Sequence, residues 1–239
     1  MPVILLGGGF KAVGDVSPAS LKIWLDASAI TGKNDGDAAG NWPSLVSGGI
    51  TLDPASGSPT YKTNIRNGKP IVRFDGVDDY SNTSSAIANF IGTTSATVFA
   101  VFSWTDGLVN PEQVFSFADG GTYRYWFGAT GVAQASMYYN GGYYSSKAAA
   151  NATWYIMSAW YDATNSYMSL TDTRTASAAS STGFAAQPNV SWNLFVTAGA
   201  GYVGIDLAEF ATWNTTLTEV ERQDVERGLA NKWGFSLPY

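Results

Sequence analysis

Three carboxylates crowd into one short turn of the sequence. Asp75, Asp78 and Asp79 surround Gly76, directly after an apolar run. Hard carboxylate oxygens at this spacing suit Ca²⁺, and Asp206, on a strand expected to lie nearby, is a fourth candidate ligand. Asp side chains in turns also commonly accept hydrogen bonds from nearby backbone amides. Two interpretations therefore stay open, a calcium site or a turn without any cofactor, and no EF-hand pattern decides between them.

A second group of candidate residues is aromatic. Between residues 123 and 144, several tyrosines and Trp126 gather around an Asn-Gly-Gly turn. Exposed rings with a polar tip suit stacking on sugars, and an amide can hydrogen-bond sugar hydroxyls. Core packing and contact with another subunit are the alternative roles for such rings. The candidate glycan contacts are Tyr123, Tyr125, Tyr138, Asn140 and Tyr143.

Missing residue types exclude several kinds of chemistry. The chain has no His and no Cys, which excludes Ser–His–Asp hydrolysis, thiol catalysis and metals bound through imidazole or thiolate. Its net charge of −6, without a basic patch, repels nucleic-acid phosphates. No apolar run reaches the ~18 residues that a membrane span needs. We therefore expect no catalytic residue, no nucleic-acid partner and no membrane span.

The elements that position these groups are mostly strands. Charged residues make up 13% of the chain, about half of the usual ~25%. Short alternating or β-branched runs recur at a spacing of about 8–12 residues, which is typical of a sandwich or jelly roll. The expected strands cover residues 21–26, 59–62, 70–75, 97–104, 113–118, 123–129, 133–139, 153–161, 167–171 and 192–198. Long loops are expected at residues 31–49 and at the Ala/Ser/Thr-rich residues 173–187.

The chain ends in one predicted helix, over residues 217–233. Thr218 and Glu221 form a capping box at its start, and Gly234 is a candidate C-cap. The opposite face carries charged residues and is expected to be solvated, so that the helix closes one side of the sandwich. The apolar face consists of Val225, Leu229 and Trp233, which recur every four residues.

The first residues form an apolar arm. Val3, Ile4, Leu5 and Leu6 precede three glycines, and no basic segment marks a secretion signal. We expect residues 1–14 to be an arm and residues 15–239 to be one β-sandwich domain. The arm is either mobile or docked on a neighbouring subunit, because exposed apolar residues favour burial. We predict docking, and hence a homo-oligomer within an assembly.

Three stretches carry a family resemblance. They are residues 23–28 (Ile-Trp-Leu-Asp-Ala-Ser) with Trp42, residues 68–80, and residues 204–234, which end in Lys-Trp-Gly. Together they resemble the concanavalin A-like lectin/glucanase superfamily in its laminin-G-like branch. The resemblance implies an all-β fold, a two-sheet antiparallel β-sandwich (jelly roll, concanavalin A-like) with one C-terminal helix. The chain lacks the cysteines of the animal branch and the Glu-x-Asp-x-Glu strand of the glucanases.

The expected function follows from these features together. Chains with this resemblance occur in bacterial surface proteins and as virion proteins of tailed bacteriophages. We expect a non-enzymatic virion component, a capsid decoration or a head or tail fibre subunit, made in the host cytoplasm. Its partners would be other virion proteins, its own copies and surface polysaccharide. The alternatives are a stand-alone lectin at the cell surface and a glycan hydrolase or lyase, which the missing carboxylate pattern disfavours.

Overall fold

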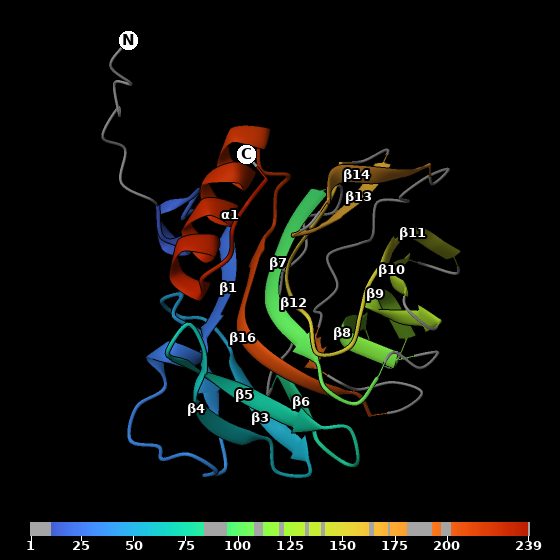
Figure 1. Cartoon of the computed structure of the whole chain (residues 1–239). Coiled ribbons are helices and arrows are strands. Elements are labelled where there is room, and N and C mark those ends of the chain that lie inside the picture. The colour runs from blue at the N-terminus through green and yellow to red at the C-terminus, as the bar shows by residue number, and fades with distance from the viewer. Residues whose placement is uncertain are drawn as a thin grey trace.

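The protein was analysed as a computed structural model (Figure 1). The structure describes residues 11–83, 95–107, 112–119, 122–131, 134–139, 142–162, 165–171, 173–180, 193–196 and 202–238. Among these residues, no helix combines the length and the apolar character that crossing a membrane requires. The expected docking residues Val3, Ile4, Leu5 and Leu6 and the glycan candidate Asn140 lie outside the described residues.

Two antiparallel sheets face each other, as the sequence predicts. Sheet A contains, in spatial order, β14 (Thr173–Ser180), β13 (Asn165–Leu170), β12 (Trp154–Asp162), β7 (Ser95–Trp104), β16 (Gly204–Trp213), β5 (Lys69–Asp75) and β4 (Thr60–Arg66), and β1 (Leu21–Asp26) also pairs with β16. Sheet B contains β11 (Gly142–Ala148), β10 (Gln134–Tyr139), β9 (Thr122–Gly131), β8 (Glu112–Asp119), β15 (Asn193–Val196), β6 (Tyr80–Thr83), β3 (Thr51–Ser56) and β2 (Trp42–Pro43). The predicted fold class is confirmed.

Strand β7 contributes side chains to two apolar clusters, one on each face of sheet A. Its side chains alternate in direction, so Ala100, Phe102 and Trp104 enter the core between the sheets, while Phe99 and Val101 pack on the other face of sheet A. All five are at most 1% exposed. The rings of Phe102 and Trp104 meet edge to face at 4.7 Å. A near-continuous apolar run therefore marks a strand that is buried on both sides.

Helix α1 (Glu219–Trp233) covers the outer face of sheet A, where the sequence places a helix (Figure 1). The capping box is formed, with Thr218 accepting from the Glu221 N–H and Glu221 accepting from the Thr218 N–H. Gly234 ends the helix at φ 71°, a left-handed conformation that glycine adopts without strain. Arg66 caps the last turn by donating to the carbonyls of Trp233 and Gly234, both at 2.9 Å.

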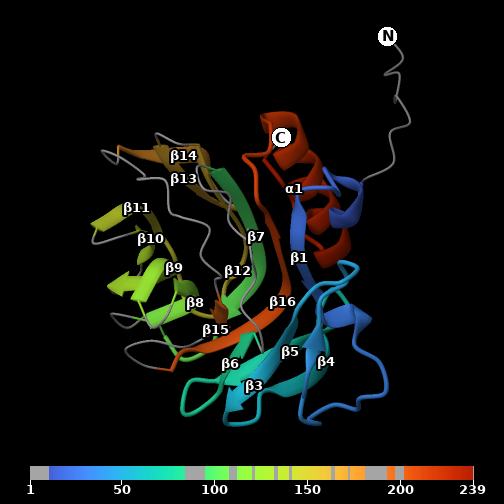
Figure 2. The ribbon, with the colours of Figure 1, turned by 180° about the vertical axis from the view of Figure 1, so that it is seen from behind.

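The view from behind shows β1 and the first described residues beside α1 (Figure 2). The short 3₁₀ helix η1 (Val13–Asp15) packs there, with Val13 only 4% exposed and in the same apolar cluster as the helix. Lys11 forms an ion pair with Asp224 at 2.8 Å. A second 3₁₀ helix, η2 (Ala27–Ala29), follows β1 directly.

Two expected loops contain strands: β2 (Trp42–Pro43) lies within residues 31–49, and β14 lies within residues 173–187. Residues 173–180 form β14 and not a loop, because an edge strand needs only backbone hydrogen bonds to its neighbour, here β13, and no alternating apolar pattern. Strand β3 is absent from the sequence prediction because Pro54 interrupts its pattern. The structure tolerates this proline beside an irregular step in the pairing with β6, between Pro54 and Ser56.

Candidate functional site

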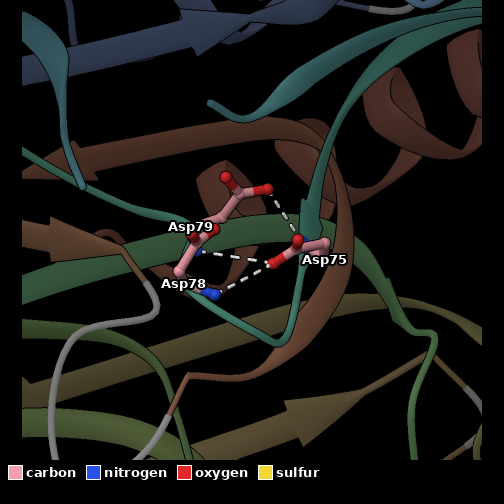
Figure 3. A group of neighbouring side chains, drawn as sticks. All are labelled: Asp75, Asp78 and Asp79. Atoms are coloured by element: carbon pink, nitrogen blue, oxygen red, sulfur yellow. Dashed lines mark hydrogen bonds between the residues drawn. The ribbon is translucent and has the colours of Figure 1, made fainter. Parts of the chain in front are cut away.

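The acidic turn, residues 75–79, joins β5 to β6. Asp75 Oδ1 accepts hydrogen bonds from the N–H groups of Val77 (2.8 Å), Asp78 (3.2 Å) and Asp79 (3.4 Å), and Figure 3 shows the last two. These donors, the Val77 amide most of all, hold the pKa of Asp75 below its ordinary value. Asp75 therefore organises the turn, as the interpretation without a metal expects.

Asp79 lies deeper, at 4% exposure. Its Oδ1 accepts from the Ser58 N–H at 2.6 Å and its Oδ2 from the Asp75 N–H at 3.0 Å. Burial raises its pKa. One carboxylate oxygen from each of Asp75, Asp78 and Asp79 lies within 4.8 Å of the others. The structure thus gathers three of the four calcium candidates, but backbone amides already engage two of them, so calcium binding stays a prediction.

The fourth candidate, Asp206, is placed elsewhere. Both of its carboxylate oxygens accept from Arg73 on the neighbouring strand, at 2.6 and 2.8 Å. This hydrogen-bonded pair raises the pKa of Arg73. Asp206 is 5% exposed and is not grouped with the acidic turn. Its role in the structure is a bidentate ion pair between β16 and β5.

The acidic turn meets other loops at one end of the sandwich, here called the loop end: residues 57–58, 75–80, 105–107 and 202–204. Asp106 Oδ2 accepts from the Gly204 N–H at 2.7 Å. A Cβ at Gly76 would lie 2.3 Å from that same oxygen, so only glycine fits there. Tyr80 and Tyr202 stand at this end with ring centroids 6.4 Å apart. The sequence does not indicate this pair because the two rings are far apart in the chain, Tyr80 at the start of β6 and Tyr202 in the segment before β16.

The predicted glycan contacts fall on three neighbouring strands. The pairing sets Tyr138 of β10 opposite Tyr143 of β11, and Tyr125 of β9 opposite Tyr139 of β10. Tyr123 of β9 lies opposite Ala118 of β8. The backbone therefore does bring these segments together. Their role in glycan binding stays a prediction.

A buried ion network is the most elaborate polar cluster among the described residues. Glu209, 2% exposed, accepts from Trp24 Nε1 through Oε1 and from Lys232 Nζ and Trp233 Nε1 through Oε2, each at 2.7 Å. Lys232 Nζ also donates to Asp26 Oδ2 at 2.5 Å. We call these five residues the helix clasp. Lys232, expected on a solvated helix face, is instead a central member.

The helix clasp sets two carboxylates side by side. Asp26 of β1 and Glu209 of β16 are directly opposite in the strand pairing, and like charges in that position repel. Burial, followed by the charge of Asp26, raises the pKa of Glu209, while Lys232 lowers it. Neither carboxylate has the exposure that a substrate would need, at 7% and 2%. The clasp therefore holds strands and helix together and is not a catalytic pair.

Comparisons with known proteins find the same fold in parts of several glycosidase structures. No protein-family model and no curated protein matches the sequence. A sialidase from Trypanosoma rangeli, solved with sialic acid, matches 92% of this chain at 13% identity and a TM-score of 0.64. The chain spans about a third (34%) of that protein. An α-L-arabinofuranosidase of glycoside hydrolase family 54 matches 81% at 8% identity and a TM-score of 0.56, over 51% of its length.

One similar structure is a single domain. Domain 4 of AbnA, a family 43 extracellular arabinanase from Geobacillus stearothermophilus, was solved with arabinotriose. This chain covers 97% of that domain with 87% of its own length, at 12% identity and a TM-score of 0.51. Likeness at such low identity establishes a shared β-sandwich fold. The finer resemblance, to laminin-G-like and bacteriophage proteins, receives no support from these comparisons.

Two functional expectations are therefore wrong. We expected a bacteriophage virion component, and we expected no enzyme; the similar structures named above all come from glycosidases. The error has a physical reason. The missing Glu-x-Asp-x-Glu pattern excludes carboxylates spaced along one strand, whereas a fold can assemble polar groups from distant segments, as the loop end does with residues 75–79, Asp106 and Tyr202.

Proposed function

We propose that this chain is a glycan-binding domain that works in the hydrolysis of glycosides. The observation that carries the proposal is the correspondence with the arabinanase domain, which this chain covers over 97% of its length and which was solved with arabinotriose. The sialidase and the arabinofuranosidase are matched over 34% and 51% of their lengths. Both are glycosidases, which supports a role for this chain in the hydrolysis of glycosides. A correspondence over a whole domain supports a domain-level role, here recognition of sugar chains.

The surface chemistry supports the same proposal. Only 13% of residues are charged, and the chain is rich in Ser, Thr, Asn and Tyr, whose hydroxyl and amide groups match sugar hydroxyls. The loop end adds an aromatic pair, the half-buried Tyr80 and the exposed Tyr202, next to the carboxylates of the acidic turn. The arabinanase that contains the matching domain is extracellular, and the proposal includes an extracellular or cell-surface site of action for this chain.

Native affinity electrophoresis tests the proposal. The purified chain is run through gels that contain arabinan, arabinoxylan, galactan or mucin, with serum albumin as a non-binding control. Release of reducing sugar from the same polymers is measured in parallel. We expect retardation in at least one gel, with or without hydrolysis. Unchanged mobility in every gel, together with no sugar release, would refute the proposed function.

A further inference from the structure

The ring pair, Tyr80 and Tyr202, joins the two sheets at the loop end. Tyr80 begins β6 of sheet B, and Tyr202 lies two residues before the start of β16 of sheet A. Their centroids lie 6.4 Å apart and their planes are inclined by 33°. Tyr202 is 39% exposed, one of the few large apolar or aromatic side chains among the described residues that faces solvent to this extent. The exposed Tyr202 ring, backed by the half-buried Tyr80 ring, is therefore accessible to a ligand.

Both rings are attached to well-anchored backbone. Tyr202 is followed by Val203, at 0% exposure, and by Gly204, whose N–H donates to Asp106 and whose carbonyl accepts from the Thr105 N–H at 2.9 Å. Tyr80 is preceded by Asp79, which is buried and bonded to two backbone amides. A ring surface held in this way is ordered before a ligand arrives, which reduces the entropic cost of binding.

The charge around the ring pair has one sign. The segments of the loop end contain Asp75, Asp78, Asp79 and Asp106 and no Lys or Arg. Arg73 precedes the acidic turn by two residues, but its guanidinium is already paired with Asp206. Carboxylates accept hydrogen bonds from sugar hydroxyls and repel ligand carboxylates. The chain as a whole, at −6, adds to that repulsion.

We propose that the ring pair is the sugar-contacting surface of this domain, and that it takes uncharged glycans and rejects carboxylated ones such as sialic acid. This inference rests on the proposed function and specifies its ligand class. A sugar ring stacks its C–H face on Tyr202, and its hydroxyls donate to the carboxylates of the acidic turn. On this proposal the chain shares a fold with sialidases but does not bind the same sugar, because the carboxylates of the acidic turn repel the carboxylate of sialic acid.

A panel of soluble glycans tests the ligand class. Binding to the purified chain is measured by titration calorimetry with arabinotriose, xylotriose and lactose as neutral probes. The carboxylated probes are 3′-sialyllactose, which carries a sialic acid on lactose, and trigalacturonic acid. We expect binding by at least one neutral probe, and roughly tenfold weaker binding, or none, by the carboxylated probes. Tighter binding of the carboxylated probes would overturn the inference while leaving glycan binding intact.

A pair of variants tests the surface. Tyr202→Ala removes the exposed ring. The control Val220→Ala removes an apolar side chain on α1 that is more exposed, at 67% against 39% for Tyr202. For the probe that binds, we expect Tyr202→Ala to weaken affinity roughly tenfold or more and Val220→Ala to leave it unchanged. Unchanged binding by Tyr202→Ala would place the sugar elsewhere and overturn the inference. Absence of binding by the wild-type chain to every probe and every polysaccharide gel would refute the proposed function itself.

Discussion

Replacing Lys232 by Met tests the helix clasp. The ammonium bridges Asp26 and Glu209, at 2.5 and 2.7 Å, and Met keeps most of the aliphatic packing while removing the charge. The variant leaves two buried carboxylates opposite each other on neighbouring strands. Removing one partner of a buried ion pair typically costs about 3–5 kcal/mol. Because the Lys232 side chain keeps 24% exposure, we expect the lower end, about 3 kcal/mol.

The measurement is urea denaturation at pH 7 followed by tryptophan fluorescence, with a thermal melt beside it. For a domain of this size, 1 kcal/mol corresponds to roughly 2–4 °C, so the expected loss in Tm is roughly 6–12 °C. Lys33→Met is the matched control, because Lys33 is exposed, and it should stay within about 0.5 kcal/mol of wild type. Equal stability losses in the two variants would refute the assigned role of the clasp.

The pH dependence of the stability of Lys232→Met tests the same role of Lys232. Burial already raises the pKa of Glu209, and Lys232 is one of the groups that lowers it, so Lys232→Met raises that pKa further. Glu209 of the folded variant then binds a proton at a pH at which Glu209 of the unfolded chain is still ionised. Its stability deficit should therefore be largest at high pH and shrink as the pH falls through the folded pKa. A deficit that grows on acidification would contradict this.

A double variant keeps the test decisive if Lys232→Met fails to fold. Asn at position 26 removes one of the two opposed charges, can still accept from the Ser28 N–H as Asp26 does at 2.9 Å, and can donate toward Glu209. Asp26→Asn/Lys232→Met should therefore recover part of the lost stability. A double variant that is less stable than Lys232→Met alone would argue against charge repulsion as the cause.

Two further predictions concern stability. Arg66→Ala removes the donors to the Trp233 and Gly234 carbonyls at the end of α1. We expect the free energy of unfolding, measured by urea denaturation, to fall by roughly 1–3 kcal/mol. An unchanged free energy of unfolding would show that water replaces the guanidinium at these carbonyls. Asp75→Ala leaves three turn amides without their acceptor. We expect it to lower the free energy of unfolding by roughly 1–3 kcal/mol, by the same amount in chelator and in millimolar Ca²⁺. A loss confined to the calcium buffer would show that Asp75 is a metal ligand.

The parts of the fold that could be predicted are those with local signals. The helix has its capping box at Thr218 and its glycine at 234, and β7 has a long apolar run, so both were placed within two residues. Strand β14 carries no such signal, since its sequence is a run of mostly Ala, Ser and Thr without an apolar alternation, and its place is set by backbone pairing with β13. The carboxylates at residues 75–79 mark the turn in the sequence, and in the structure Asp75 accepts from three amides of that turn.

The candidate site was harder to predict because its residues come from separate loops. Tyr202 stands alone in the sequence, and only the pairing of β5 with β16 brings the loop before Gly204 beside the acidic turn. Asp206 was assigned to the turn because its strand was expected nearby. The strand does lie there, but Arg73 on β5 takes both oxygens of Asp206. Strand adjacency is predictable from the fold, whereas the direction of one side chain is not.

The helix clasp explains why the sequence resemblance predicted the fold and not the function. Trp24 and Asp26 belong to the first stretch of the resemblance, and Glu209, Lys232 and Trp233 belong to the third. The structure joins them in one buried network that fixes β1, β16 and α1 to one another. Such residues are constrained by packing and by paired charge, whatever the domain binds. The exposed ring of Tyr202 lies outside all three stretches and outside this network, so ligand choice can change there while the sandwich stays the same.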